Sequence, residues 1–473
     1  MYGLKDRVKV VGTIGPASCE QAQINNLLLA GLDVFRLNLS HGTHAWHKAN
    51  LDKINSAKNS IESNAAVLFD LQGPKVRINK FINPDGEFFL VGDVVRLEFS
   101  DTAVCTRDTL YIASEFSVFS NVNLGNTLLL DDGKFALEVT EKGADSFTCR
   151  VIVAGQLTSN KGINLFNGGL NLPTITEKDR ADLLFLQDLE FDFIALSFVR
   201  SANDIKDLQN LISNFKHKPK ILAKFETSDA ITNYEAIIEA ADGIMVARGD
   251  LAIEVGAQKV PWLQKKLVRT ACIHKKPAIV ATQMMESMIT ASQPTRAEVS
   301  DVANAILDGA DAVMLSGETA VGVNPGNVIK QVVNICCEAN MHSMHHQTAN
   351  IKFTSVQQVI AMSAVEASHK MNVDFLVALT ETGDTALLFS KFGIKIPILG
   401  LSRHKSALSR MSLYKNVTPI YFDVLAHKSD IIQIVVRTLM ENAVVTKGDK
   451  IIITKGGALG VVGETNSMVI LEV

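Results

Sequence analysis

The sequence predicts an α/β protein: a (β/α)8 TIM barrel with an inserted all-β barrel domain and an open α/β domain at the C-terminal end. Eight short apolar stretches of strand character alternate with helical stretches before residue 340. Between the third and the fourth, residues 72–167 contain only strand and turn patterns. Eight strand–helix units are the number that closes a parallel barrel with its helices outside.

The barrel is expected to comprise residues 1–71 and 168–340. Its first three strands are expected at 8–15, 33–40 and 65–71, with intervening helices at 20–30 and 44–60. After the insertion, a helix is expected at 177–189. The remaining strands are expected at 191–198, 220–225, 243–247, 278–282 and 312–315, with a helical run at 228–241 between two of them.

Two further segments complete the domain organisation. Residues 341–354 are polar and are interpreted as a linker. Residues 355–473 alternate between helix and strand, beginning with a helix at 356–370, and are expected to form the open α/β domain. Thr380–Thr385 lies between a strand and a helix, where backbone N–H groups can hold a phosphate, although such turns are common without a ligand.

Composition excludes several classes of protein. The 473 residues carry a net charge of −4 and no long basic tract, which argues against sequence-independent nucleic-acid binding. No apolar run reaches the roughly 18 to 20 residues of a membrane helix, and the first residues lack the pattern of a secretory signal, so a cytoplasmic enzyme is expected. The cysteines lack metal-type spacing and are interpreted as reduced core thiols: Cys19, Cys105, Cys149, Cys272, Cys336 and Cys337.

Charged residues follow two neighbouring strands of the predicted barrel. Lys224 and Glu226 close the strand at 220–225, and Arg248 and Asp250 follow the next strand. Since side chains alternate along a strand, each pair is expected to share a face, and a parallel β-α-β unit would place the pairs side by side. Two carboxylates suit a divalent metal, and two cations suit an anionic substrate such as a phosphate.

The same pattern recurs at all eight predicted strand ends, although charges at a single strand end are often only solvated residues. Polar or charged residues are found in every one of TIGPAS, RLNLSHG, DLQGPKVR, SFVR, KFE, ARGD, ATQMMES and LSGET. Active sites of such barrels lie at the carboxyl ends of the strands, so the pattern predicts an active site there.

These motifs identify a family resemblance. The chain resembles pyruvate kinases from end to end, most specifically in RLNLSHGT (36–43), SNKGINL (159–165), MVARGDLAIEV (245–255), ATQMMESMI (281–289) and the segment 294–320. The resemblance implies transfer of the phosphoryl group of phosphoenolpyruvate to ADP, which gives ATP and pyruvate in the last step of glycolysis.

The resemblance also assigns roles to individual residues. Glu226 and Asp250 match the two ligands of Mg²⁺ or Mn²⁺. Lys224 matches the lysine that neutralises the phosphoryl group in transfer and the enolate, and Arg36 matches the arginine that binds the substrate phosphate.

Other matches concern the substrate carboxylate, the proton and the nucleotide. Gly249 and Asp250, at a helix-like turn, match the backbone cradle of the carboxylate together with the hydroxyl of Thr282. Thr282 and Ser316 match residues implicated in proton delivery to the enolate, and the immediate donor is left open. The nucleotide contacts match His41, Arg77 and Lys161, and the inserted domain is expected to act as a lid.

The chain departs from the K⁺-dependent members of the family. Their ion is bound by groups that match Asn38, Ser40, Asp70 and Leu71, with a threonine at the last position and a glutamate where this chain has Lys75. A tethered ammonium can replace the charge of the ion. We therefore expect that K⁺ is not required, the alternative being that Lys75 is only an exposed lysine.

The C-terminal domain resembles the bacterial branch that AMP or sugar monophosphates activate. Asp384 occupies a position that is commonly basic, and its carboxylate disfavours binding of fructose 1,6-bisphosphate. The resemblance implies a homotetramer, as is common in the family. The expected monophosphate site consists of Thr380, Thr382, Gly383, Thr385, Ser402 and Arg403.

Two other functions are weighed against a pyruvate kinase. A phosphoenolpyruvate-using lyase or mutase on the same type of barrel would share the metal and enolate chemistry, but it would not need Arg77, Lys161 or the inserted lid. A catalytically inactive homologue acting as a metabolite sensor should have lost one of Arg36, Lys224, Glu226 or Asp250, and the chain retains all four. Both observations favour the kinase.

Overall fold

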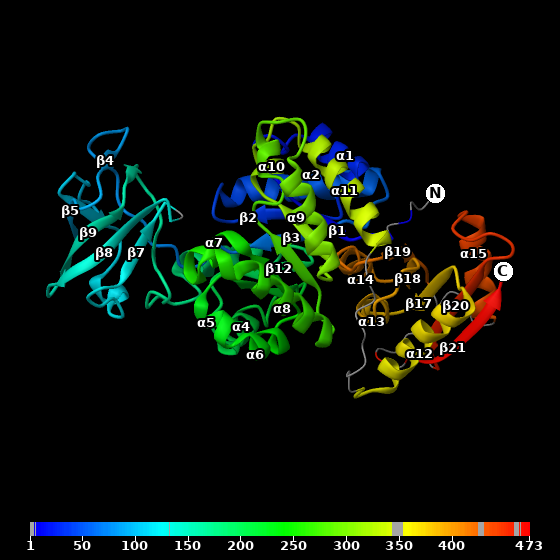
Figure 1. The fold of residues 1–473 in the computed structure, drawn as a ribbon. Helices are drawn as coiled ribbons and strands as arrows, with labels where there is room; N and C mark the ends of the chain where they lie inside the picture. Colours follow the sequence, from blue (N-terminus) through cyan, green and yellow to red (C-terminus); the bar gives the residue numbers. More distant parts are fainter. Residues whose placement is uncertain are drawn as a thin grey trace.

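The structure, a computed structural model, consists of three parts arranged in a row (Figure 1). It describes residues 4, 6–131, 133–342, 353–423, 430–457, 463 and 465–473. The β-rich inserted domain lies at one end of the molecule, the barrel in the middle and the C-terminal domain at the other end (Figure 1). Most of the expected linker at 341–354 lies outside the described residues.

The central part is a closed barrel of eight parallel strands in the order β1-β16-β15-β14-β13-β12-β3-β2. The predicted TIM barrel is confirmed; five of its strands are one to four residues shorter than expected, and the other three have the expected bounds. The strands are β1 (Lys9–Thr13), β2 (Val34–Asn38), β3 (Ala66–Asp70), β12 (Phe193–Leu196), β13 (Lys220–Phe225), β14 (Gly243–Ala247), β15 (Ala278–Ala281) and β16 (Ala312–Leu315).

Helices surround this barrel, and several of them begin at residues whose side chains cap the helix N-terminus. Thr176 and Thr295 form capping boxes with Asp179 and Glu298, in which each side chain pairs with a free backbone N–H of the other residue. The expected helical run 228–241 is two helices that meet at Asn233. The helices are α1 (Gln21–Ala30), α2 (His44–Ser60), α3 (Glu177–Leu186), α4 (Ala202–Leu211), α5 (Ser228–Thr232), α6 (Tyr234–Ala240), α7 (Arg248–Val255), α8 (Val260–Ile273), α9 (Arg296–Leu307), α10 (Gly317–Ala320) and α11 (Pro325–Met341), with short 3-10 turns η2 (Ala257–Lys259) and η3 (Glu286–Ile289).

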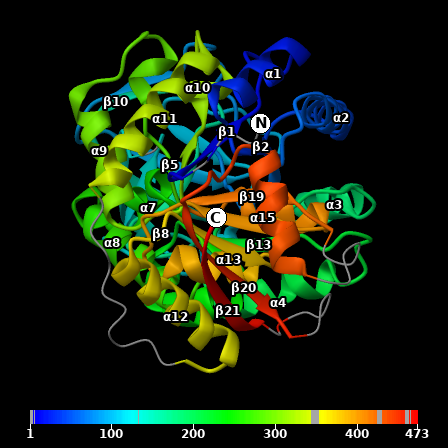
Figure 2. The same ribbon diagram turned by 90° about the vertical axis from the view of Figure 1, so that its right-hand side faces the viewer.

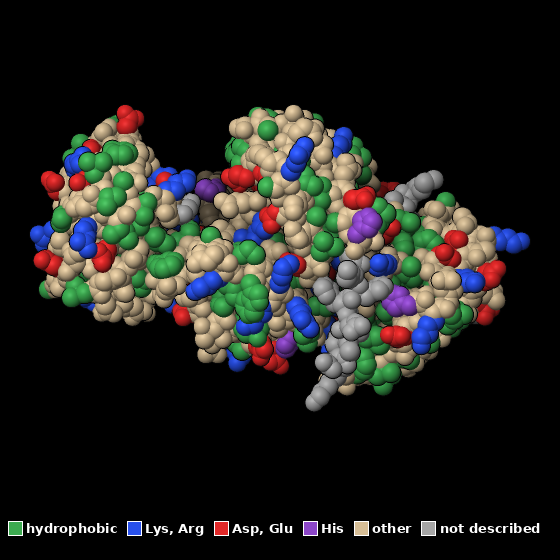
Figure 3. Space-filling model, in the orientation of Figure 1, with side chains coloured by type: hydrophobic (Ala, Val, Ile, Leu, Met, Phe, Trp, Pro, Cys, Tyr) green, Lys and Arg blue, Asp and Glu red, His purple; other side chains and the backbone are tan. Residues whose placement is uncertain are grey.

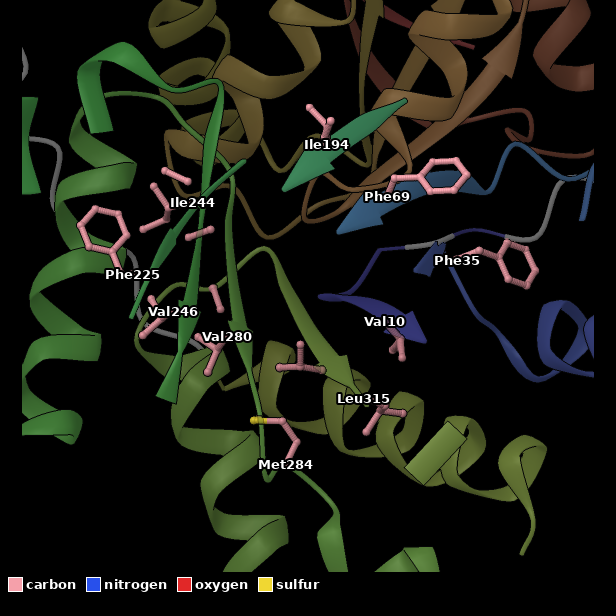
Figure 4. Close-up of a cluster of buried hydrophobic side chains, with 14 of the residues drawn as sticks. Val10, Phe35, Phe69, Ile194, Phe225, Ile244, Val246, Val280, Met284 and Leu315 are labelled. Carbon is pink, nitrogen blue, oxygen red and sulfur yellow. The ribbon is translucent and has the colours of Figure 1, made fainter. Parts of the chain in front are cut away.

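The main hydrophobic core lies between the strands and these helices. Val10, Phe35, Phe69 and Phe225 extend from the barrel strands into this layer and are fully buried (Figure 4). Alternate strand residues such as Leu68 belong to a second cluster because successive side chains point to opposite faces. The barrel is therefore a packed scaffold that holds its strand ends at fixed positions.

The inserted domain follows β3, and the regular elements of its described residues are strands and one 3-10 turn. Its main sheet has the order β11-β7-β8-β9-β5-β6, beside a two-stranded sheet of β10 and β4. Arg77 pairs with Gly162 next to β11, and Ile78 pairs with Ile112 of β6, so one segment links both edges of the sheet as in a barrel. The elements are β4 (Glu87–Phe89), β5 (Val94–Phe99), β6 (Thr109–Ile112), η1 (Phe116–Phe119), β7 (Thr127–Leu130), β8 (Phe135–Lys142), β9 (Ser146–Val153), β10 (Gly155–Leu157) and β11 (Ile163–Leu165).

The C-terminal domain has a five-stranded sheet in the order β19-β18-β17-β20-β21, in which only β21 is antiparallel to its neighbour. Figure 2 shows β20, β21 and α15 on the side of the domain away from the barrel. The predicted open α/β domain is confirmed. Its elements are α12 (Val356–Met371), β17 (Phe375–Leu379), α13 (Asp384–Lys391), β18 (Ile398–Ser402), α14 (Lys405–Met411), β19 (Val417–Tyr421), α15 (Ile431–Glu441), β20 (Lys450–Gly456) and β21 (Thr465–Glu472).

Buried polar contacts join the C-terminal domain to the amino ends of the barrel strands. The Lys391 ammonium of α13 pairs with the Asp311 carboxylate, and both side chains are almost fully buried. Lys9 of β1 donates to the carbonyl of Val417 at 2.7 Å. A buried ion pair loses much of its favourable energy if one partner is removed, so these contacts make the docking of the two domains specific.

The cysteines agree only in part with the expectation. All six are free thiols, but Cys337 is exposed, so the interpretation as core thiols is wrong for that residue. Among the described residues, no helix combines the length and the apolar character needed to cross a membrane.

Candidate active site

Lys224 lies at the centre of a buried group of charges at the carboxyl end of β13. Its ammonium is 3.0 Å from Glu226 Oε1 and 3.2 Å from Asp70 Oδ1, and it donates to Ser197 Oγ at 2.6 Å. Burial by itself lowers the pKa of Lys224, but the carboxylates of Asp70 and Glu226 outweigh that effect, and the net pKa is raised. Lys224 therefore remains an ammonium. Its predicted position on the same face as Glu226 is confirmed.

The two carboxylates expected to bind a metal influence each other. Glu226 is fully buried and accepts from the Phe198 N–H at 2.7 Å, whereas Asp250, near the start of α7, is partly exposed. Burial raises the pKa of Glu226, and the negative charge of Asp250 raises it further, against the opposing effect of Lys224. A cation near both carboxylates would relieve this repulsion.

This set of oxygen donors fits a hard divalent cation. Among the described residues, no three His, Cys, Asp or Glu side chains converge as a complete metal cage. Mg²⁺ commonly uses only one or two carboxylates and completes its coordination with water and substrate phosphates. Glu226 and Asp250 therefore fit Mg²⁺ or Mn²⁺ better than they fit a metal that requires several protein ligands.

Arg36, from β2, is fixed beside the same group. Its guanidinium donates to Asp70 Oδ2 through Nε at 2.8 Å and through Nη2 at 2.7 Å, and Nη1 donates to Thr13 Oγ1 at 2.9 Å. Burial raises the pKa of Asp70, but the charges of Lys224 and Arg36 outweigh burial and the net pKa is lowered. Asp70 is thus an ionised carboxylate that holds both cations in place.

The residues of the expected K⁺ region surround Asp70. Asn38 Oδ1 accepts from the Ser40 N–H at 3.1 Å, and the Leu71 carbonyl accepts from Ser197 Oγ at 2.7 Å. Lys75 Nζ is 4.0 Å from Asp250 Oδ1, so this ammonium reaches the expected metal site. That contact disfavours the alternative in which Lys75 is only an exposed lysine.

Thr282 and Gly249 lie together where β15 ends and α7 begins. The Gly249 N–H donates to Thr282 Oγ1 at 2.8 Å, and Thr282 has a φ of +71°. A positive φ is uncommon for a β-branched residue and occurs mainly at turns and functional sites. Ser316 follows β16, and its N–H donates to the buried Glu318 carboxylate at 2.7 Å.

Arg248 does not join this group as expected. β14 ends at Ala247, and Arg248 is the first residue of α7, so the alternation of side chains along a strand does not extend to it. Its guanidinium instead contacts Asp301 at 2.7 Å and donates to the Thr282 carbonyl at 2.8 Å. The expectation of a second free cation here is wrong, and Arg248 supports the strained turn at Thr282.

The three expected nucleotide contacts lie around the junction of the lid and the barrel. Arg77 pairs with Gly162 at the base of the lid, and Lys161 Nζ is 2.7 Å from Asp131 of the lid itself. His41 is exposed, and its carbonyl accepts from His47 Nε2 at 2.8 Å. A hollow separates the lid from the barrel, with basic, acidic and histidine side chains around it (Figure 3).

The expected effector residues lie at the turn between β17 and α13 and at the end of β18. The Gly383 N–H donates to Thr380 Oγ1 at 3.0 Å, and the Asp384 N–H donates to Thr382 Oγ1 at 3.4 Å. Arg403 Nε donates to Glu381 Oε2 at 3.1 Å. Thr385 and Ser402 are buried. A phosphate at this turn must therefore replace internal hydrogen bonds.

Sequence reasoning missed several residues that orient the charged group. Ser197, within SFVR, joins Lys224 to Leu71, and Thr13, within TIGPAS, orients Arg36. Glu318 accepts from the N–H groups of both Met285 and Ser316. All three belong to the polar strand-end motifs, so that signal was present. Their partners depend on which strands become neighbours.

Glu254 makes stability depend on pH. Burial, with smaller contributions from Asp229 and Asp250, raises the pKa of Glu254 from 4.5 to about 7. Between these two pKa values, the folded protein keeps a proton that the unfolded chain releases, so its unfolding free energy falls as the pH rises from 4.5 to about 7. We expect the unfolding free energy of Glu254→Gln, relative to that of the wild type, to increase by up to about 3 kcal/mol between acidic and neutral pH. Urea unfolding of both proteins at several pH values measures this difference, and two parallel stability curves would contradict it.

The fold and the site together indicate a class of protein: a phosphotransferase whose candidate active site lies at the carboxyl ends of the strands of a TIM barrel. Comparison with known proteins gives the family. Residues 5–329 match the family description "Pyruvate kinase, barrel domain", and residues 358–471 match "Pyruvate kinase, alpha/beta domain". The chain belongs to the pyruvate kinase family.

Individual relatives agree over the full length. The chain is 38% identical to a pyruvate kinase of Buchnera aphidicola from Acyrthosiphon pisum, covering 99% of this chain and 98% of the relative. It is 38% identical to pyruvate kinase II of Salmonella typhimurium, with the same coverage. The crystal structure of a pyruvate kinase from Cryptosporidium parvum superimposes with a TM-score of 0.92 at 30% identity, covering 99% of this chain and 96% of that chain.

Proposed function

We propose that this chain transfers the phosphoryl group of phosphoenolpyruvate to ADP, giving ATP and pyruvate, with Lys224 as the central catalytic cation. One observation carries the proposal: a buried ammonium is held between Asp70 and Glu226, beside Arg36 and next to Asp250. Cations held in a buried site act strongly on developing negative charge because little water screens them.

Different side chains of the site bind different groups of the substrate. Arg36 and Lys224 bind the phosphate, and Lys224 then neutralises the enolate oxygen as the phosphoryl group leaves. When bound at Glu226 and Asp250, Mg²⁺ or Mn²⁺ supplies further positive charge to the same oxygens. The backbone at Gly249 and Asp250 begins α7, where N–H groups lack intrahelical partners, and with the Thr282 hydroxyl it holds the carboxylate, which must replace the bond from the Gly249 N–H to Thr282 Oγ1.

The remaining steps involve the proton and the nucleotide. Thr282 and Ser316 deliver a proton to the enolate carbon through water, which completes pyruvate. Arg77, Lys161 and His41 bind the phosphates of ADP when the lid closes. Because Lys161 pairs with Asp131 within the lid, nucleotide binding must exchange that ion pair for a phosphate contact.

A coupled assay of pyruvate formation tests this function. We expect turnover only when phosphoenolpyruvate, ADP and a divalent metal are all present. Pyruvate formation without ADP would instead indicate a lyase or mutase, and the absence of turnover would indicate an inactive sensor. The lid with Arg77 and Lys161 supports the first outcome, as do the retained side chains of Arg36, Lys224, Glu226 and Asp250.

We predict turnover without added K⁺. Lys75 Nζ lies 4.0 Å from Asp250, so its ammonium supplies charge near the phosphoryl site. The measurement compares rates in tetramethylammonium chloride and in KCl, for the wild type and for Lys75→Glu. We expect similar rates for the wild type and a several-fold stimulation by K⁺ for the variant. A many-fold stimulation of the wild type would refute the prediction.

We also propose activation by AMP or a sugar monophosphate at Thr380, Thr382, Gly383, Thr385, Ser402 and Arg403. Glu381 holds Arg403 in the structure, and a phosphate has to compete for that guanidinium. Titration of AMP, ribose 5-phosphate and fructose 1,6-bisphosphate against phosphoenolpyruvate saturation should show activation by a monophosphate only. If none of the three compounds changes the phosphoenolpyruvate saturation curve, the proposal is wrong.

We propose further that the chain works as a cytoplasmic homotetramer, as the family resemblance implies. Exposed apolar side chains on the outer helices support self-association, including Trp262 of α8 and Met341 of α11, each 64% exposed.

A further inference from the structure

A cavity of about 290 Å³ lies between the barrel and the C-terminal domain, on the opposite side of the barrel from the candidate active site. Its barrel side includes His274, Lys275 and Lys276, which connect α8 to β15. Its other side includes Gln357 of α12, Asp384 of α13, and Tyr414. The volume is close to the lower end of the range of small-ligand sites, about 300 to 1,000 Å³.

Tyr414 indicates that the cavity is built for a polar occupant. Only 4% of this residue is exposed, it lines the cavity, and its hydroxyl is not among the polar atoms that are enclosed without a partner in the described part of the chain. Burial raises the pKa of this phenol, so it stays protonated and can donate. A tyrosine hydroxyl at a cavity wall can donate to a polar ligand in the cavity.

The backbone conformation of Lys275 is a second, independent indication of a ligand site. It follows the C-cap of α8 with a φ of +58°, and the Lys276 N–H donates to the Ala271 carbonyl, which is the helix-ending pattern that favours glycine. The chain places lysine where glycine has the lower backbone energy. The Lys275 ammonium donates to Gln358 Oε1 at 3.3 Å, beside the cavity.

The charges around the cavity favour an anion. Lys220 and Asp242 pair with each other at 2.9 Å. Lys275 and Lys276 have no ion-pair partner in the described part of the chain, although Lys276 Nζ donates to the Ala241 carbonyl at 2.6 Å, and burial lowers the pKa of both ammonium groups. Asp384 is the remaining carboxylate. Two partly desolvated ammonium groups thus face one carboxylate, which leaves one excess positive charge to attract an anion.

We propose that this cavity binds a small phosphate monoester that also carries hydroxyl groups. Its phosphate contacts Lys275 and Lys276, and its hydroxyl groups pair with Asp384 and Tyr414. The site shares the Asp384 side chain with the turn at Thr380–Thr385, but it does not use the N–H groups of that turn at Gly383 and Asp384, which bond to threonine hydroxyls. The proposal does not rest on the catalytic roles assigned above.

Isothermal titration calorimetry of the full chain tests the proposal, with glucose 6-phosphate, ribose 5-phosphate and inorganic phosphate as probes. The decisive variant is Lys275→Gly, which removes the ammonium but suits the backbone. We expect its melting temperature to equal or exceed that of the wild type while sugar phosphates bind about tenfold more weakly or worse. Tyr414→Phe removes only the hydroxyl and should weaken binding by about threefold to tenfold.

Two controls make the result specific. Lys266→Gln removes a charge from the outer face of α8, where the ammonium lies 3.9 Å from the centre of the Tyr234 ring, and should bind like the wild type. Thr382→Val tests the turn, where a monophosphate site is proposed above: it should lose at most the binding that occurs at the turn and keep the binding that Lys275→Gly removes. The proposal is overturned if no sugar phosphate binds the wild type, if Lys275→Gly and Tyr414→Phe both bind normally, or if only Thr382→Val loses binding. If inorganic phosphate binds more strongly than either sugar phosphate, the proposed contacts of the ligand hydroxyl groups are wrong. Pyruvate formation without effector is measured separately, so failure of this site differs from failure of the kinase function.

Discussion

Replacing Lys224 with methionine should lower kcat by about three orders of magnitude. A single positioned group that stabilises developing charge in an active site typically contributes about 10² to 10³ in rate, and Lys224 acts on both the phosphoryl group and the enolate. The ammonium also balances Asp70 and Glu226, which lie within 3.2 Å of it. Removing it leaves two buried carboxylates without that partner, so we also expect a loss of about 3 to 5 kcal/mol in unfolding free energy.

Lys391→Met is a matched control for this experiment. Lys391 is also a buried ammonium, and it pairs with Asp311 at the opposite end of the barrel. Its removal should cost a similar unfolding free energy while kcat changes by less than about threefold. Steady-state kinetics and urea unfolding of the two variants separate catalysis from folding. If both variants lose kcat equally, or if Lys224→Met retains near-normal kcat, the central role of Lys224 is wrong.

Asp250→Asn and Glu226→Gln should each weaken binding of Mn²⁺ at least about 100-fold and abolish measurable turnover. Each change removes one of two anionic oxygen donors from a site that hard cations bind mainly through charge. Loss of an orienting partner behind a ligand already costs about 10- to 100-fold in affinity, so loss of a ligand should cost at least as much. Electron paramagnetic resonance of Mn²⁺ measures binding to the protein without substrates, independently of activity.

Glu254→Gln is the control for the metal experiment. Glu254 lies one helical turn after Asp250 on α7 and accepts from Ser228 at 3.4 Å. Its replacement should leave Mn²⁺ affinity within about threefold of the wild type, because the side chain lies off the expected site. Equal losses of Mn²⁺ affinity in Glu254→Gln and Asp250→Asn would show that any nearby negative charge, and not a specific ligand, decides the affinity. Unchanged Mn²⁺ binding in both ligand variants would place the metal elsewhere.

Local sequence patterns were sufficient where a single element decides the geometry. Lys224 and Glu226 were expected on one face, and they contact each other at 3.0 Å because β13 runs straight to Phe225. The same reasoning was wrong for Arg248, because β14 ends at Ala247 as expected and Arg248 is already the first residue of α7, so strand alternation does not apply to it. Strand ends are decided by competition between the strand and the following helix, which short sequence windows describe poorly.

The sequence by itself determined the barrel, the inserted domain, the C-terminal layer and the positions of the candidate catalytic side chains at the strand ends. These features follow from the periodicity of apolar residues and from strand-end motifs, which are local properties of the chain. Only the tertiary structure decided that Ser197 and Asp70 hold Lys224, that Lys75 reaches Asp250, and that Lys275 and Tyr414 line one cavity. These contacts join residues distant in sequence, because closure of the barrel and docking of the C-terminal domain decide which strand ends and loops become neighbours.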